Sequence, residues 1–146
     1  MIRRVDVWAV ESLVSNINRT QRAAIVPMGV YVFALGEYIK IGKYSKDNPW
    51  SRVVHRGFRS VRCPVEIAMM SKDEQIRRLD LVAWFRDLDG KHEKQCHRYM
   101  HKYRVCGEWY KLVGSERAVA YLKSRGRQTH VTCEHKTAAM RSRRRL

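Results

Sequence analysis

Hydrophobic and polar residues alternate on both sides of a glycine in the stretch GVYVFALGEYIKIGKY, residues 29–44. The alternating runs 29–34 and 37–42 flank Leu35-Gly36. A period of two on either side of a glycine predicts a β-hairpin. One face of this hairpin is aliphatic, and we expect it to be the core. Its members are Val30, Val32, Ile39 and Ile41.

The opposite face of the predicted hairpin carries aromatic side chains and one lysine: Tyr31, Phe33, Tyr38 and Lys40. A tight turn centred on Leu35-Gly36 pairs Tyr31 with Lys40, and their Cβ atoms then lie about 5 Å apart. On spacing alone, this face also fits an ordinary half-exposed hairpin with a solvated lysine.

The rest of the chain predicts short helices and strands. Helices are expected over residues 5–18, 49–56, 91–104 and 115–126, and strands over 79–85 and 106–112. Asp47 or Asn48 can cap the second helix, which Gly57 ends. The segment 58–78 reads as an insertion, in which VRCPVEIAMM resembles a strand and SKDEQIRR a polar loop or helical turn.

The net charge of +16 arises from 30 Lys and Arg against 14 Asp and Glu. Basic residues are in excess within residues 28–113 as well as in the C-terminal tail. A polyanionic partner is therefore expected, with nucleic acid favoured over a membrane surface and a secreted cationic protein as the alternative. No apolar run approaches the ~20 residues of a membrane span. Asp6 and Glu11 interrupt what would be the core of a signal peptide.

The four cysteines are scattered and have no CxxC spacing, which is typical of reduced thiols in an intracellular, reducing compartment. The cytoplasm or nucleus of a host cell and a virion are the compartments that we consider. Two groups also invite comparison with zinc sites: His92, Cys96, His97, His101 and Cys106, and Cys133 with His135. Neither group has a standard zinc ligand spacing, so zinc is a minor alternative.

Several motifs occur in a fixed order along the chain. They are Gly29-Val30-Tyr31, then Lys40-Ile41-Gly42, then Arg52 on a predicted helix and Glu93 on a later one. In this order they resemble the GIY-YIG nuclease domain. The likeness is closer to a phage- and virus-rich branch with K-I-G as its second motif and E-x-x-x-H followed by G-E-W-[FY]. Here these are Glu93 to His97 and Gly107-Glu108-Trp109-Tyr110.

The resemblance covers residues 28–113 and implies an α/β (α+β) domain with a short mixed or antiparallel sheet flanked by helices. Residues 1–27 would form an N-terminal helical extension that either forms a homodimer or packs within the same chain, and 114–126 a C-terminal helix. Residues 127–146 would be a basic tail, disordered alone and ordered against phosphate.

The resemblance also implies phosphodiester hydrolysis with one divalent metal ion, Mg²⁺ or Mn²⁺. Tyr31 and Lys40 would lie at the nucleophile side, Arg52 would bind the scissile phosphate, and Glu93 would hold the metal. His55 and His97 are candidate proton carriers, because histidine titrates near neutral pH.

The chemistry of these residues suits that reaction. An unperturbed tyrosine has a pKa of about 10, and Lys40 beside Tyr31 would lower it by favouring the phenolate. The guanidinium of Arg52 suits phosphate, and the carboxylate of Glu93 suits Mg²⁺ or Mn²⁺. We expect a set of basic residues to contact nucleic acid: Lys43, Arg52, Arg56, Arg59, Arg141, Arg143, Arg144 and Arg145.

The sequence thus favours a metal-dependent endonuclease that acts on DNA in preference to RNA. The alternative is a non-catalytic nucleic-acid-binding protein that retains the fold, as a structural component of a virion or ribonucleoprotein. Glu93 distinguishes the two, because a carboxylate among phosphate-binding cations repels phosphate unless a metal bridges them. Glu93 and His97 can alternatively be an ordinary surface pair four residues apart on a helix.

Overall fold

The computed structural model of the protein describes residues 29–58 and 62–145. The helix expected over residues 5–18, the rest of the extension 1–27 and Arg59 lie outside this part of the chain. In the part that is described, an α+β fold is built around a five-stranded sheet in which every pairing is antiparallel. The strand order is β3-β1-β2-β5-β4. The bounds are β1 Gly29–Leu35, β2 Tyr38–Tyr44, β3 Asp80–Phe85, β4 Arg104–Cys106 and β5 Trp109–Lys111.

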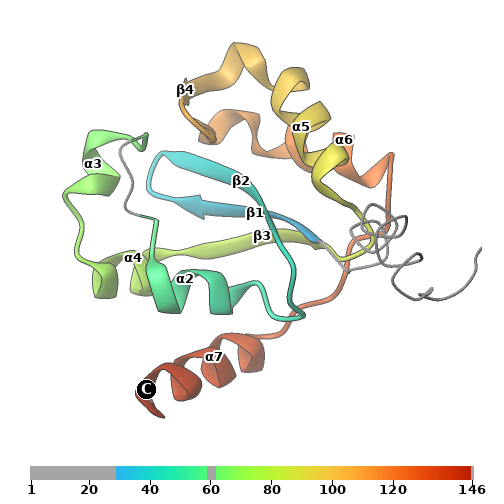
Figure 1. Ribbon diagram of the computed structural model, residues 1–146. Helices are drawn as coiled ribbons and strands as arrows, with labels where there is room; N and C mark the ends of the chain where they lie inside the picture. Colours follow the sequence, from blue (N-terminus) through green and yellow to red (C-terminus); the bar gives the residue numbers. More distant parts are fainter. Residues whose placement is uncertain (1–28, 59–61, 146) are drawn as a thin grey trace, which may run out of the picture.

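Helices cover both faces of the sheet (Figure 1). On one face lie α5 (Gly90–Tyr99) and α6 (Ser115–Lys123), and on the other lie α2 (Trp50–Arg56) and α4 (Lys72–Arg78). The short α3 (Val65–Ala68) precedes α4, and α7 (Cys133–Arg145) packs against α2. Among the described residues, no helix is both long and apolar enough to span a bilayer.

Local signals explain where α2 and α5 begin. The side chain of Asn48 accepts a hydrogen bond from the backbone N–H of Trp50 at 3.1 Å, and Gly57 ends α2 with φ of 68°. Asp89 caps α5 by accepting from the backbone N–H groups of Lys91 and His92. These bounds confirm the predicted helix over 49–56. The helix predicted over 91–104 begins at Gly90 but ends at Tyr99, and Arg104 belongs to β4.

The hairpin is confirmed, but the predicted register is wrong by two residues. The turn lies at Gly36-Glu37, where Gly36 has φ of +60°, and Tyr31 faces Gly42 instead of Lys40. Glycine tolerates this left-handed conformation, which fixes the turn one residue later. Gly42 also leaves room for the tyrosine ring, since a Cβ there would lie 2.3 Å from the Tyr31 hydroxyl. A shift of two residues moves no side chain to the other face.

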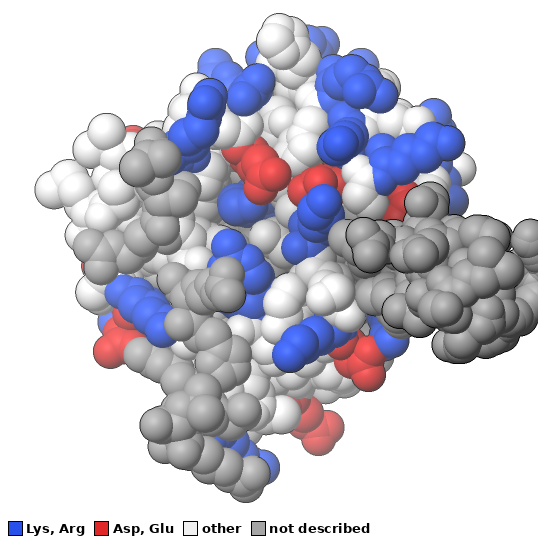
Figure 2. Space-filling view, in the orientation of Figure 1, with Lys and Arg blue, Asp and Glu red and all other residues white. Residues whose placement is uncertain are grey.

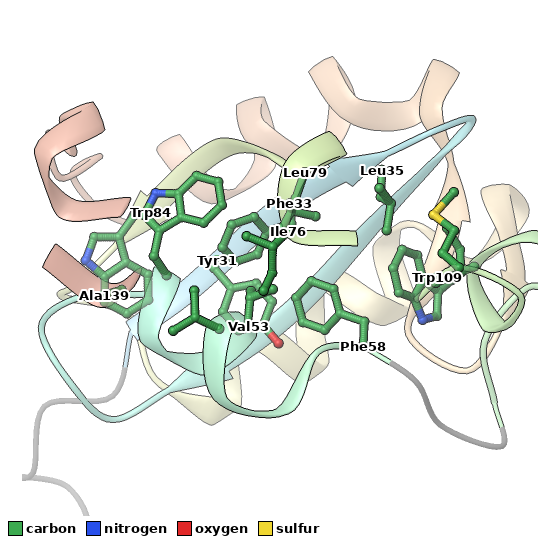
Figure 3. Packing of buried hydrophobic residues seen from close by; sticks show 14 residues of the cluster. Tyr31, Phe33, Leu35, Val53, Phe58, Ile76, Leu79, Trp84, Trp109 and Ala139 are labelled. Atoms are coloured by element: carbon green, nitrogen blue, oxygen red, sulfur yellow. The ribbon is translucent and has the colours of Figure 1, made fainter. Parts of the chain in front are cut away.

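The expectation that only one face of the hairpin is core is also wrong, because both faces are buried. Val30, Val32, Ile39 and Ile41 pack with side chains of α5 and α6, and we call this the aliphatic face. The opposite side, the aromatic face, is closed by rings (Figure 3). Its main members are Tyr31, Phe33, Phe58, Trp84 and Trp109.

Residues 62–78 form helices where a strand was one expectation. Pro64 precedes α3, whose Ile67 is buried. The hydroxyl of Ser71 accepts from the backbone N–H of Glu74 at 3.1 Å and caps α4, which buries Ile76. The SKDEQIRR segment is therefore helical because it has a cap and a buried apolar residue, and residues 62–70 form a turn and α3 instead of a strand.

Residues 133–145 of the basic tail form the helix α7, which packs on the domain and differs from the predicted disorder. Ala139 of α7 is 2% exposed. The side-chain amide of Asn48 donates to the carbonyl of His135 at 2.7 Å. The Lys136 ammonium lies 4.6 Å from the centroid of the Trp50 ring. These contacts hold α7 against α2.

Candidate active site

The candidate site lies where β5 ends along β2. β5 pairs with Tyr38–Lys40 only, and beyond it the backbone N–H of Ile41 bonds to the carbonyl of Glu108 at 3.2 Å. Glu108 belongs to the turn between β4 and β5. Because the neighbouring strand stops here, side chains from both sides of the sheet can meet around β2.

Tyr31 and Lys40 form a buried polar pair, despite the difference in register. The Lys40 ammonium donates to the Tyr31 hydroxyl at 3.4 Å and lies 5.5 Å from the centre of its ring. Lys40 is 9% exposed and Tyr31 is 1% exposed. The half-exposed hairpin with a solvated lysine is therefore not what the structure contains.

Glu108 is the partner of Lys40, and the sequence did not indicate it as a site residue. The Lys40 ammonium lies 2.5 Å from Glu108 Oε1. Burial raises the pKa of the Glu108 carboxyl, but the Lys40 charge and hydrogen bond, with His97 and Lys43 nearby, outweigh burial and hold that pKa below its usual value. This carboxylate thus stays ionised beside the lysine.

Glu93 and His97 lie on α5 and reach the same place. His97 Nε2 is 3.5 Å from Glu93 Oε2 and 3.7 Å from Glu108 Oε2. Glu93 is only 5% exposed, so this pair is not a solvated surface pair. The imidazole stacks on the Tyr110 ring at 5.6 Å, and its Nδ1 lies 2.5 Å from the Tyr110 hydroxyl. Burial raises the pKa of Tyr110, so its hydroxyl remains protonated at neutral pH.

One ligand atom from each of Glu93, His97 and Glu108 lies within 4.8 Å of the others. His97 Nε2 is a buried polar atom without a hydrogen-bond partner among the described residues. Two carboxylate oxygens and an unpartnered imidazole nitrogen form a donor set that fits a divalent metal ion. Glu93, the predicted metal ligand, is a member of this group.

Arg52 and Lys40 both contact the Phe58 ring. The Arg52 guanidinium carbon is 5.5 Å from the centroid of the Phe58 ring, and Lys40 Nζ is 5.6 Å from the same centroid. One Arg52 nitrogen donates to the carbonyl of Gly57 at 3.1 Å. Because a guanidinium carries five N–H donors, Arg52 retains donors for a phosphate.

The other predicted residues are placed less fully. The backbones of His55 and Arg56 lie in α2 and those of Arg143, Arg144 and Arg145 in α7, but these side chains are outside the described part. Lys43 and Arg141 are exposed on β2 and α7. The basic residues on the face drawn in Figure 2 gather over the region of β4, α5 and α6, with acidic side chains between them.

The residues considered for zinc are not gathered. Cys96 faces the core, and burial raises the pKa of its thiol to about 12, so it is not the thiolate that zinc requires. His92 Nδ1 lies 2.8 Å from the Asp89 carboxylate at the start of α5, and His101 is exposed. Among the described residues, the group with metal-ligand geometry is Glu93, His97 and Glu108 instead.

Comparisons of the chain with models of protein families, with curated proteins and with solved structures gave no match.

Proposed function

We propose that this protein is a metal-dependent endonuclease of the GIY-YIG type, which hydrolyses phosphodiester bonds of nucleic acid and prefers DNA to RNA. One observation carries this proposal. Through Glu108, the Tyr31–Lys40 pair is connected to the carboxylate–histidine group of α5. A proton acceptor, a cation and a set of metal ligands thus lie next to one another, as hydrolysis of a phosphodiester requires.

The residues take roles that follow from their positions. As the phenolate, Tyr31 accepts the proton of the attacking water and becomes the neutral phenol, and the Lys40 ammonium next to its oxygen stabilises the phenolate before this transfer. Arg52 binds a phosphate oxygen with the donors that Gly57 does not use. A divalent ion bound at Glu93 would neutralise charge on the phosphate and acidify a bound water.

Exposure indicates the side from which substrate approaches. The side chains of Glu93 and Lys40 are 6% and 11% exposed, whereas that of Glu108 is 48% exposed. We therefore place the substrate on the Glu108 side of the group. The positive charge of the chain would draw a polyanion to this region.

A non-catalytic nucleic-acid-binding protein is the second candidate. Its specific support is α7, a helix rich in arginine that docks on α2 and presents Arg141 to solvent. Binding through such a helix needs no buried carboxylate. Glu93 beside Glu108 would only repel phosphate in a pure binder, which favours the enzyme.

The test is cleavage of supercoiled plasmid and of single-stranded RNA with Mg²⁺ or Mn²⁺. We expect the wild type to nick or linearise the plasmid and Glu93→Ala to lose this activity. Glu93→Gln, which keeps the side-chain shape, serves as a second variant in case alanine prevents folding. The exposed Glu116 on α6 provides the control variant Glu116→Gln, which should cut like the wild type.

Two outcomes contradict the proposal. Equal cutting by the wild type and both Glu93 variants would show that Glu93 does not hold the metal. If the wild type and the Glu93 variants all fail to cut but all bind nucleic acid with a steep dependence on salt, the protein is the non-catalytic binder.

A further inference from the structure

We propose that Glu93, His97 and Glu108 together form a site for one transition-metal ion of the Mn²⁺ type, with the His97 imidazole as a direct ligand. The inference rests on the proposed function in that it completes the metal site of that nuclease. It goes beyond a single carboxylate ligand, because it assigns the whole donor set and the class of metal.

The spacing of the donors fits a single ion. Two donors that each bond to one ion at about 2.1 Å lie about 3.0 to 4.2 Å apart, depending on the bond angle. His97 Nε2 lies 3.5 Å from Glu93 Oε2 and 3.7 Å from Glu108 Oε2. An ion between the three side chains therefore needs only small side-chain movements.

The contact with Tyr110 allows the His97 tautomer that a metal requires. The Tyr110 hydroxyl donates to the carbonyl oxygen of His97 at 3.4 Å, and its oxygen lies 2.5 Å from His97 Nδ1. When its proton is directed to the carbonyl, that oxygen is the acceptor for Nδ1–H. The lone pair of the neutral ring is then on Nε2, which faces the two carboxylates. Metal-binding histidines almost always donate their other ring N–H in this manner.

Glu93 provides a second, independent indication. Its carboxylate is buried, and its one ionic contact among the described residues is to His97 Nε2. A buried charge is costly unless it is paired or binds a metal. A neutral His97 does not compensate the charge of Glu93, whereas a divalent ion does.

The imidazole decides which metal is preferred. Mg²⁺ favours oxygen ligands and retains several waters, whereas imidazole nitrogen suits transition metals. Mn²⁺ shares the preference of Mg²⁺ for carboxylate oxygen and, as a transition metal, also binds an imidazole, which suits a set of two carboxylates and one imidazole. Glu108 also connects the site to Lys40, because Oε1 contacts the ammonium while Oε2 faces His97.

A metal-free alternative has a different consequence. A protonated His97 between the two carboxylates would form an ion-paired group that needs no metal. It predicts no tight metal binding, so direct measurement of metal affinity separates the two.

The experiment measures Mn²⁺ and Mg²⁺ binding to the full chain by titration calorimetry, with electron paramagnetic resonance to count free Mn²⁺. We expect one Mn²⁺ per chain, bound at least about tenfold more tightly than Mg²⁺. His97→Ala and Glu108→Gln should each weaken Mn²⁺ binding by about tenfold or more. The loss of affinity for Mg²⁺ on His97→Ala should be smaller. His101→Ala, an exposed histidine just beyond α5, is the matched control and should bind like the wild type.

Thermal unfolding in the presence of chelator identifies variants that fail to fold. If His97→Ala fails to fold, Glu108→Gln still tests the site, because Glu108 lies in an exposed turn. Mn²⁺ binding that is unchanged in a folded His97→Ala, or in Glu108→Gln, would overturn the inference. So would equal affinity of the wild type for Mg²⁺ and Mn²⁺. A chain that binds Mn²⁺ as described but cuts no nucleic acid would overturn the proposed nuclease and support the site. A chain that cuts nucleic acid but binds Mn²⁺ independently of His97 would support the proposed nuclease and overturn the metal site.

Discussion

The two faces of the hairpin are made by alternate residues of the same strands, yet they differ in chemistry. On the aliphatic face, the hairpin contributes valine and isoleucine to a cluster with Met100 and Leu122. On the aromatic face, it contributes Tyr31, Phe33 and the buried Lys40. Among the side chains of the hairpin itself, only those on the aromatic face bring titratable groups, Tyr31 and Lys40, into the candidate site.

The difference shows how a small sheet can hold a lysine inside. Lys40 Nζ lies 5.5 Å and 5.6 Å from the centroids of the Tyr31 and Phe58 rings and pairs with Glu108. Aromatic rings attract a cation electrostatically, which hydrocarbon side chains do not. The aromatic face can thus carry charge, whereas the aliphatic face serves as scaffold. Substitutions on the two faces should therefore separate activity from stability.

The largest effect is expected for Tyr31→Phe on the aromatic face. Removal of a general base typically lowers the rate about 10²- to 10⁴-fold. Loss of one hydroxyl hydrogen bond should cost only about 1 kcal/mol of stability. Plasmid nicking rates and thermal unfolding measure the two quantities.

Tyr38→Phe is the matched control for this substitution. Tyr38 lies on the same hairpin, and its hydroxyl donates to Glu66 at 2.6 Å, away from the candidate site. It should cleave like the wild type. If Tyr31→Phe nicks plasmid as fast as Tyr38→Phe, Tyr31 is not the base.

Leu122→Ala, on α6 where it packs against the aliphatic face, should instead lower the free energy of unfolding, by an amount comparable to the activation free energy lost in Tyr31→Phe. Leu122 is fully buried, and truncation of a buried leucine costs about 2–5 kcal/mol in unfolding free energy. Nicking per folded molecule, measured well below the melting temperature, should not change. Val113, which is 80% exposed, gives the control Val113→Ala with a change below about 0.5 kcal/mol. A loss of activity in fully folded Leu122→Ala would mean that the faces are not separable.

Alternation predicted the sorting of the hairpin side chains but not their burial. A register error of two residues leaves every side chain on its face. The prediction that Ile39 and Lys40 lie on opposite faces is therefore correct although the predicted turn is wrong. The pattern does not show what covers each face. Coverage of the aromatic face comes from Phe58, Trp84 and Trp109, which lie on separate segments.

Only part of the candidate site could be predicted, because its contacts join distant parts of the chain. Lys40 and Glu108 are 68 residues apart, and no periodicity connects them. Glu108 belongs to the motif G-E-W-Y, which indicated a resemblance to a family but did not indicate that Glu108 contacts Lys40. Glu93 and His97 were predictable because a helix places residues four apart on one side.

The packing of the tail was missed for a similar reason. The residues that hold α7 are few and separated, among them Ala139, buried against the domain, and His135, bonded to Asn48. An arginine-rich segment with few apolar residues predicts disorder when its neighbours are unknown.

The smallest effect is expected at Asp89, which fixes the start of α5 over the aliphatic face. Asp89→Ala removes a cap and should cost about 1 kcal/mol of stability at neutral pH. Burial raises the pKa of Asp89, but hydrogen bonds from His92 and Lys91 and the His92 charge outweigh it, so the folded pKa lies below the usual value. A depressed carboxylate pKa stabilises the fold above the unfolded value of about 3.9 and ceases to do so as pH falls through the folded value.

Asp89→Asn keeps a good cap without the charge, so it separates the two contributions. Thermal unfolding of the wild type, Asp89→Asn and Asp89→Ala should be compared at pH 7 and pH 3. At pH 7 the asparagine variant should lie close to the wild type, and the alanine variant below both. At pH 3, below the unfolded value of about 3.9, part of the charged contribution of the wild type has been lost, so any advantage over Asp89→Asn should shrink. An advantage that grows on acidification would contradict the sign of the Asp89 pKa shift, and with it the assignment of this carboxylate as the cap that positions Glu93 and His97.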